Sequence, residues 1–172
     1  MTSLADAQAG ICELHARYSD ATFRKDFDAF AGCFTPDGEW RISGRVFRGR
    51  TEVREGIAAI LDKFIRVLIS FRTPILTVGD GIASGRTWVD ERCAWKNGDT
   101  NISIGLYYEH FVEVEGRWLF DWRMFETHYR GAPDMTGEFF DHKDYGAPPA
   151  MPPRDVTTQD MASTRWGLSP KG

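Results

Sequence analysis

The feature that most constrains the fold is a run of three long β-type segments in the second half of the chain. Residues 83–95 and 101–114 are rich in strand-forming residues and flank the turn 96–99, Lys-Asn-Gly-Asp. Residues 117–128 follow a second turn, Glu115-Gly116. An Asn-Gly pair between two such segments is a strong signal for a β-hairpin. The sequence therefore predicts long antiparallel strands joined by tight turns.

The first half of the chain carries helical patterns instead. Apolar residues from Leu4 to Arg24 recur at the spacing of one helix face, and a second apolar stripe follows Asp26, a plausible N-cap. A third helix is expected from Gly49, with Thr51 as its cap and an apolar stripe that extends to Leu68. Shorter strands are expected at residues 39–43, 46–48 and 73–78. Three helices before a run of strands indicate an α+β fold, with a curved antiparallel sheet wrapped around the helices as a cone with a hydrophobic interior.

Length and composition narrow the classes of protein further. The 172 residues fit one domain, residues 1–130, followed by a Pro- and Gly-rich extended tail, residues 131–172, in which Trp166 is expected to act as an anchor. The net charge of -4 argues against nucleic-acid and anionic-membrane partners. The N-terminus lacks the pattern of a signal peptide, and no apolar run is long enough to span a membrane. The cysteines, Cys12, Cys33 and Cys93, are scattered and predict buried free thiols in a reducing cytoplasm.

The aromatic content is high for a domain of this size. Phe, Trp and Tyr make up 13% of the residues. Placed on the cone, part of this set is expected to line a pocket for a hydrophobic, aromatic small molecule, with His128 at its mouth. The expected pocket residues are Phe23, Phe34, Trp40, Phe71, Trp95, Phe111, Phe125 and His128. Trp88, His110 and Trp122 are expected on the outer sheet face, where they predict a homo-oligomer, a dimer or a trimer.

An ordered set of short motifs carries a family resemblance. The motifs are Ala16-Arg17-Tyr18, Asp26-Phe27-Asp28, residues 34–40, residues 83–88, and residues 105–111 running into Trp118. In these motifs the chain resembles the SnoaL-like branch of the nuclear transport factor two superfamily, over roughly residues 4–130. The resemblance implies a cone-shaped α+β barrel. It leaves function open, because this fold is used by isomerases, dehydratases, cyclases, epoxide hydrolases and plain ligand binders.

The resemblance implies some site residues. Tyr18 and Glu109 match the Tyr and the Asp that form the oxyanion hole of ketosteroid isomerase. Arg123 matches an Arg of lindane dehydrochlorinase. Glu91, or Asp90 one place away, matches an acidic residue of bile-acid dehydratase.

Other family residues have no counterpart in this chain. The base of ketosteroid isomerase falls at Ile42. The Asp–His pair of the dehydrochlorinase and of the scytalone and bile-acid dehydratases falls near Phe23 and between Ile69 and Arg72, where neither Asp nor His is present. A mechanism that differs from that of the known dehydratases is therefore expected.

Strand alternation groups the candidate catalytic residues. If Glu109 points into the cone, Tyr107 and Phe111 do so too. An apolar cone raises the pKa of Glu109, whereas a neighbouring Arg lowers it and keeps the carboxylate ionised. The alternative to a catalytic role for Glu109 is a purely structural ion pair with an Arg across the sheet. Arg72 either polarises a substrate oxygen or pairs with an acidic residue, Asp90 or Glu91.

The function expected from these residues is that of a cofactor-independent lyase or isomerase. Glu109 or Glu91 moves the proton, and Tyr18, Tyr107, Arg72 and Arg123 hold the oxygen that gains charge. The elimination releases water or another small fragment such as formaldehyde. The alternatives are a non-catalytic ligand-binding protein and the small subunit of a ring-hydroxylating dioxygenase.

The remaining histidines are given structural roles. His15 is expected to neighbour Tyr18 on the first helix. No metal site is expected, because the chain lacks HxxxH and HExxH motifs. His142, with Asp141 and Asp144 beside it, predicts a solvated charged turn.

Overall fold

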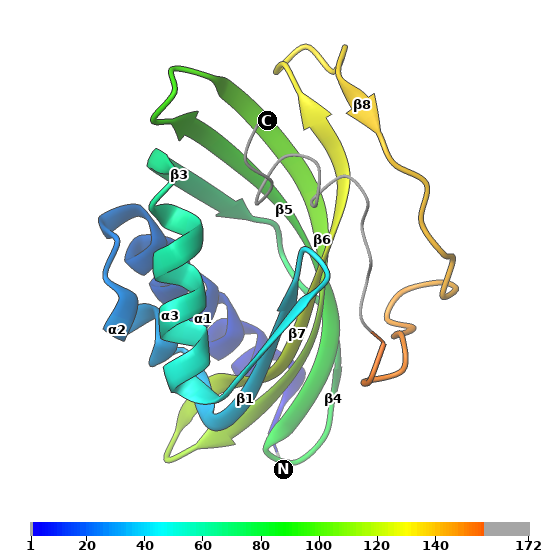
Figure 1. Cartoon of the computed structure of the whole chain (residues 1–172). Helices are drawn as coiled ribbons and strands as arrows, with labels where there is room; N and C mark the ends of the chain where they lie inside the picture. Colours follow the sequence, from blue (N-terminus) through cyan, green and yellow to red (C-terminus); the bar gives the residue numbers. More distant parts are fainter. Residues whose placement is uncertain (1, 157–172) are drawn as a thin grey trace.

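The computed structural model describes residues 2–156 as three helices against one curved sheet (Figure 1). The helices are α1 (Leu4–Arg24), α2 (Phe27–Ala31) and α3 (Gly49–Leu61). The strands are β1 (Phe34–Ile42), β2 (Arg45–Arg48), β3 (Phe64–Phe71), β4 (Ile75–Val78), β5 (Ile82–Trp95), β6 (Thr100–Val114), β7 (Arg117–Gly131) and β8 (Glu138–Phe139). The expected α+β cone is confirmed.

The sheet is open, and it is not purely antiparallel. Its strand order is β2-β1-β7-β6-β5-β3, with β4 beside β5 and β8 beside β7. β1 runs parallel to β7, so the expectation of a wholly antiparallel sheet was wrong at this pair. The three helices lie in the concave side of the sheet, as Figure 1 shows. Side chains on that side therefore form the interior of the cone.

Two of the three described helices begin with a side-chain N-cap. The Ser3 side chain accepts a hydrogen bond from the Asp6 backbone N–H at the start of α1, and Asp26 caps α2 through Ala29 as predicted. α3 starts at Gly49 without a side-chain cap, so Thr51 lies inside the helix and does not cap it.

The third helix is shorter than its apolar stripe suggested. It ends at Leu61, and the stripe residues beyond it form β3. From Val67 onward the strand shows the two-residue alternation of a strand with one covered face, because Val67 and Ile69 are buried while Leu68 and Ser70 are exposed. Ile65 departs from this alternation, at the point where the register with β5 shifts between Phe64 and Arg66. Hydrogen-bonded pairing of residues 64–71 with β5 favours the strand over a continuation of the helix.

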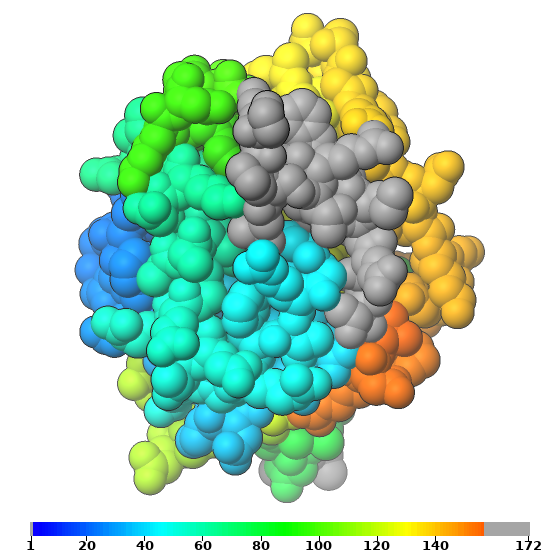
Figure 2. All heavy atoms as spheres, viewed as in Figure 1, coloured from blue at the N-terminus to red at the C-terminus, as the bar shows by residue number. Residues whose placement is uncertain are grey.

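The outer face of the sheet is partly covered by the chain itself. Residues 131–156 run along that side in Figure 1 and follow one edge of the molecule in Figure 2. Trp122 is fully buried there in a small cluster with Leu106, Tyr108 and Met124, beneath Tyr145, Met151 and Val156. Trp122 is therefore covered by the tail and is not a free subunit contact. Trp166 lies outside the described residues, and the division into cone and tail stays a prediction.

No described helix is both long and apolar enough to cross a bilayer.

Candidate active site

Glu109 is at the centre of a buried polar cluster inside the cone. It points inward from β6, opposite Arg123 on β7, and both side chains are 0% exposed. Arg123 Nη2 donates to Glu109 Oε1 at 2.6 Å, and Thr87 Oγ1 on β5 donates to Oε2 at 2.6 Å. His15 Nε2, from α1, lies 3.1 Å from each carboxylate oxygen. Four elements therefore converge on one carboxylate.

These contacts set the charge of Glu109 and the orientation of His15. Burial alone raises the pKa of Glu109, but its contacts with His15, Arg123 and Thr87 outweigh burial and hold the pKa below its ordinary value. Arg123 balances the charge of the ionised carboxylate. In the neutral tautomer with its proton on Nε2, His15 donates to Glu109 and its Nδ1 keeps a lone pair. Among the described residues Nδ1 has no hydrogen-bond partner.

The guanidinium of Arg123 is enclosed by aromatic rings. Its Cζ lies 3.6 Å from the centroid of Tyr107, 3.9 Å from that of Phe120 and 4.3 Å from that of Tyr18. Stacking of this kind favours the cation in an apolar site. Within the described part of the chain, Nε and Nη1 of Arg123 have no hydrogen-bond acceptor. Buried donors without acceptors are rare, and here they lie beside the carboxylate and the tyrosines.

Two tyrosine hydroxyls meet beside this cluster. The oxygens of Tyr18 and Tyr107 are 3.3 Å apart. Burial, the largest cause, raises the pKa of Tyr18 well above its ordinary value and that of Tyr107 to about 12. Both phenols are therefore protonated near neutral pH. Since one O–H serves their mutual hydrogen bond, the other proton is left to donate to a ligand oxygen.

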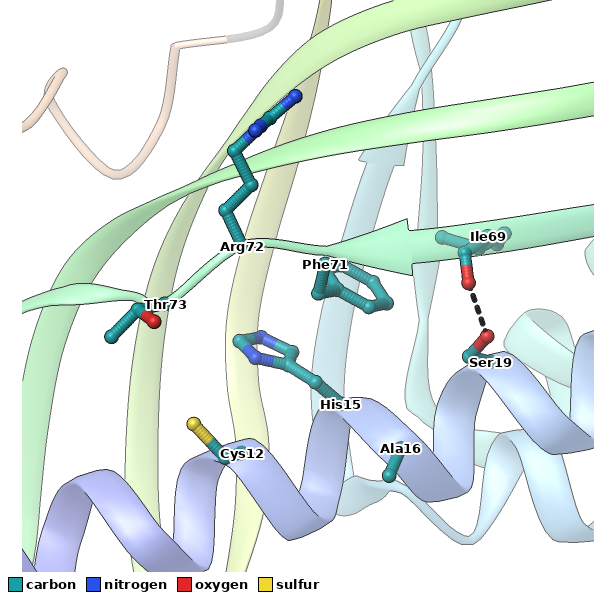
Figure 3. A pocket seen from close by; sticks show the side chains of 8 residues that line it. All are labelled: Cys12, His15, Ala16, Ser19, Ile69, Phe71, Arg72 and Thr73. Atoms are coloured by element: carbon teal, nitrogen blue, oxygen red, sulfur yellow. Dashed lines mark hydrogen bonds between the residues drawn. The ribbon is translucent and has the colours of Figure 1, made fainter.

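His15 lines a cleft between α1 and the end of β3. The cleft has a volume of about 270 Å³ and is lined by Cys12, His15, Ala16, Ser19, Ile69, Phe71, Arg72 and Thr73. Figure 3 shows the imidazole at the centre, beneath the ring of Phe71, with the Cys12 thiol one turn earlier on α1. The two rings are stacked, with centroids 4.4 Å apart and planes 11° apart. The cleft therefore leads to the buried cluster through His15 and Phe71.

Glu91 is a second inward carboxylate, and it lies apart from the Glu109 contacts. It is half-buried on β5, opposite Ile69 on one side and Ser103 on the other. Burial raises its pKa to about 7, against the opposing effect of Arg130 and Arg123. Its charge in turn helps to raise the pKa values of Tyr18 and Tyr107. Near neutral pH this carboxyl can therefore both accept and release a proton.

Arg72 does not join the cluster. It lies at the rim of the cleft, and its side chain extends away from His15 in Figure 3. Its Nη2 donates to Asp90 at 2.9 Å, and the guanidinium is mostly exposed. The structure thus gives Arg72 the surface ion pair that was its alternative role.

The expected pocket residues divide into three groups. Phe34, Trp40, Phe111 and Phe125 are buried in the interior. Phe71 borders the cleft, and Trp95 is half-buried against Phe64, its Nε1–H donating to Asn101.

Phe23 and His128 do not line the interior, so these two placements were wrong. Phe23 is 43% exposed, and Arg66 lies over its ring. His128 lies on the outer face against the ring of Trp88. The register of β6 and β7 shifts between Ile104 and Gly105, which leaves His128 as the unpaired residue between Thr127 and Tyr129.

The main residue missing from the predicted site was His15. The sequence placed it near Tyr18 but gave it a structural role. The available signal was a titratable side chain within the buried stripe of α1, between Ile11 and Tyr18. Its partner Glu109 could not be identified, because the two residues are 94 positions apart in the chain.

Comparisons with known proteins point to one family. A family model described as SnoaL-like domain matches residues 3–124. A variant of Rv3472, a protein of unknown function from Mycobacterium tuberculosis, is 28% identical with a TM-score of 0.65, over 73% of this chain and 76% of that one. A comparison with curated proteins finds no match.

Two solved structures at lower identity share the fold. A hexachlorocyclohexane dehydrochlorinase, LinA type 2, is 14% identical with a TM-score of 0.68, over 86% of this chain and 99% of that one. A Novosphingobium aromaticivorans protein provisionally named a scytalone dehydratase is 18% identical with a TM-score of 0.66, over 76% and 94% of the two chains.

Proposed function

Because the chain belongs to the family of SnoaL-like domains, we propose that it is a cofactor-independent acid/base catalyst, a lyase or an isomerase, for a small hydrophobic molecule. One observation carries the proposal. The His15–Glu109 pair is buried inside the cone, and the second imidazole nitrogen, Nδ1, has no hydrogen-bond partner among the described residues. A carboxylate-oriented histidine with a free lone pair is an arrangement suited to general-base catalysis.

The pair replaces the Asp–His pair that the family resemblance implied. The chain has Phe23 and Ile69 where that pair falls, yet a different carboxylate and a different histidine meet in the interior. In the proposed step Nδ1 of His15 accepts a proton from a substrate C–H bond, and the bonding electrons move into the substrate. The ionised Glu109 stabilises the resulting imidazolium. A positioned general base of this kind contributes roughly 10² to 10⁴ in rate.

The charge that develops on the substrate has donors available. The unpaired Nε–H and Nη1–H groups of Arg123 and the free proton of the Tyr18–Tyr107 pair are buried, fixed dipoles. Removing one such donor to a developing oxyanion slows a reaction by a factor of about 10² to 10³. Returning the proton to another carbon completes an isomerisation. Loss of a leaving group with the electron pair completes an elimination.

Glu91 is proposed as the acid that assists the leaving group. With a pKa of about 7 it is partly protonated at neutral pH. A leaving hydroxyl that takes this proton departs as water. In the alternative fragmentation, Nδ1 of His15 accepts the O–H proton of a hydroxymethyl group, the C–C bond breaks to release formaldehyde, and Glu91 protonates the substrate carbon that keeps the electron pair.

Phe71 is proposed as the gate to the site. Its ring contacts His15, and it lies 5.9 Å from the ring of Tyr18 and 6.0 Å from that of Tyr107. A ligand that enters the cleft reaches the tyrosine hydroxyls only if this ring rotates. Phe71 is half-buried at the end of β3, a position that leaves room for rotation.

The cleft limits the size of the substrate. Its volume of about 270 Å³ lies just below the roughly 300–1,000 Å³ of most ligand pockets. A cavity of about 150 Å³ is enough for benzene. The substrate class that fits is therefore a compound of one or two rings, and the surrounding aromatic residues favour an aromatic one.

The test uses proton exchange, because the first step does not depend on the identity of the product. Small cyclic and aryl ketones are incubated in D₂O with the protein, and deuterium incorporation is followed by NMR. The wild type is expected to exchange at least one of these ketones, and His15→Gln is expected to slow that exchange at least hundredfold. His110→Gln, on the outer sheet face, is the matched control and retains the rate.

Three outcomes would contradict the proposal. An unchanged rate in His15→Gln would remove His15 as the base. Tight ligand binding without exchange in the wild type would favour the non-catalytic binding protein instead. Co-purification with a larger iron protein would favour the dioxygenase small subunit.

We further propose a homo-oligomer formed through the outer sheet face. Leu68 and Trp88 are exposed there beside a groove that also includes Ile104 and Met135. Light scattering on the purified chain is expected to give a dimer or trimer, and a monomer would contradict this. Cys33 and Cys93 are buried as expected, whereas Cys12 is exposed, so its predicted burial was wrong. The three free thiols support the proposed cytoplasmic location.

A further inference from the structure

A second polar cluster lies on the outer face of the sheet, away from the proposed active site. It consists of Glu126 and His128 on β7 and His142 in the tail. Glu126 pairs across the ladder with Leu106, whose side chain belongs to the outer cluster, whereas Phe125 pairs with Tyr107 of the interior. The sheet therefore separates this cluster from Glu109 and Arg123.

Three potential ligand atoms converge in this cluster. Oε2 of Glu126 lies 3.7 Å from Nε2 of His128 and 3.7 Å from Nδ1 of His142. The three ligand atoms all lie within 4.8 Å of one another. The two imidazole rings are in contact and tilted, with centroids 4.2 Å apart and planes 32° apart.

Two of the atoms that face one another have no hydrogen-bond partner among the described residues. Glu126 is 1% exposed, yet within residues 2–156 neither its Oε2 nor the buried Nε2 of His128 makes a hydrogen bond. Nε2 of His142 is at hydrogen-bond distance from the backbone oxygen of Thr127, so this nitrogen carries the proton and donates. Nδ1 of His142 then turns its lone pair towards Glu126. A buried carboxylate oxygen that faces a nitrogen lone pair is unfavourable, and a cation between the two atoms removes this cost.

We propose that Glu126, His128 and His142 form a binding site for a divalent transition-metal ion of the zinc class. Two imidazole nitrogens and one carboxylate oxygen are a common ligand set for such ions. In a tetrahedral site with bonds of about 2.05 Å the ligand atoms are about 3.3 Å apart. The two distances to Oε2 therefore need to shorten by only about 0.4 Å. The hydrogen bond from His142 to the Thr127 carbonyl is also the outer contact that orients metal-binding histidines.

The site has a structural consequence, because its ligands come from two parts of the chain. Glu126 and His128 belong to the sheet, whereas His142 lies between β8 and the segment that covers Tyr108 and Trp122. A bound ion ties this segment to β7. The tail is otherwise held by contacts such as Arg41 to Asp155 and Arg154 to Asp121.

The test measures Zn²⁺ binding to the full chain by calorimetry, after chelation with EDTA and without a histidine tag. The wild type is expected to bind one Zn²⁺ per chain. His142→Asn and Glu126→Gln are each expected to weaken binding at least tenfold. His110→Asn is the matched control, since it removes an imidazole from the same sheet face outside the cluster. Cys12 and His15 are unchanged in all variants, so their contribution to background binding is constant.

A second measurement reports on the tail and does not depend on affinity. Zn²⁺ is expected to slow amide hydrogen exchange in residues 138–146 of the wild type, and to leave exchange in His142→Asn unchanged. Equal Zn²⁺ binding by the wild type and His142→Asn would overturn the proposal. The proposal would also be overturned if the wild type bound no Zn²⁺ and its tail became ordered when a histidine is protonated. A proton, and not a metal ion, would then lie between Glu126 and the histidines.

Discussion

The buried pair of Glu109 and Arg123 yields a prediction whose size follows from the structure. Both side chains are 0% exposed, and the carboxylate accepts hydrogen bonds from Arg123 and Thr87 while contacting His15. Glu109→Gln keeps the shape of the side chain but removes its charge, so it opens no cavity. The guanidinium is then left buried without a counter-charge, and two of its donor groups already have no acceptor among the described residues.

The expected loss of stability is large. Removing one partner of a buried ion pair costs about 3–5 kcal/mol. With a urea m-value of roughly 2 kcal/mol per molar, this corresponds to a midpoint about 2 M lower. Urea unfolding at pH 7, followed by circular dichroism, measures it. Glu113→Gln, which changes an exposed carboxylate on the same strand, is the control and is expected to stay within about 0.5 kcal/mol.

The pH dependence separates the loss of charge from a packing defect. The folded-state pKa of Glu109 lies below its unfolded value. The carboxylate therefore stabilises the fold above the unfolded pKa of about 4.3, and this contribution is lost as the pH falls through the folded pKa. The difference between wild type and Glu109→Gln should shrink as the pH is lowered below about 4. A difference under 1 kcal/mol at pH 7, or one that does not vary with pH, would refute the reasoning.

Three further changes have defined outcomes. The folded-state pKa of Glu91 is raised to about 7, so the wild type loses stability as the pH rises from about 4.3 to 7. Glu91→Gln removes that loss, so the urea midpoint of the variant should rise relative to that of the wild type from pH 4 to pH 8. A difference between the two midpoints that does not vary with pH would contradict this. Phe71→Ala is expected to increase the affinity for two-ring aromatic ligands, measured by quenching of tryptophan fluorescence, and unchanged affinity would count against a gate. In Gly105→Ala the added Cβ would lie 2.2 Å from the Phe125 ring and 2.7 Å from the Glu126 carbonyl oxygen, so thermal unfolding should report a loss of about 1–3 kcal/mol.

The sequence predicted the parts of the fold that depend on local signals. The Asn97-Gly98 turn and the long segments around it formed the expected hairpin of β5 and β6. Strand alternation placed Tyr107 and Glu109 on the inner face of β6, opposite Phe125 and Arg123 on β7. The stripe from Ile57 to Leu68 predicted too long a helix, because the chain is helical only as far as Leu61 and forms strand β3 after it.

The site was harder to predict, because it depends on contacts between distant residues. His128 was expected at the pocket mouth because it lies near the end of a strand, although alternation from Arg123 and Phe125 points it to the outer face. His15 reaches Glu109 only through the packing of α1 into the cone. His142 was assigned to a solvated turn, since its approach to Glu126 depends on how the tail follows the sheet.

The central claim is that His15 is a neutral base held by an ionised Glu109. The most direct test is nitrogen-15 NMR of the histidine rings at pH 7, with the His15 signals identified by their loss in His15→Gln. The account predicts that Nε2 is protonated and Nδ1 is not. A proton on Nδ1, whether in the other tautomer or in the imidazolium, would leave no lone pair to accept the substrate proton and would contradict the account.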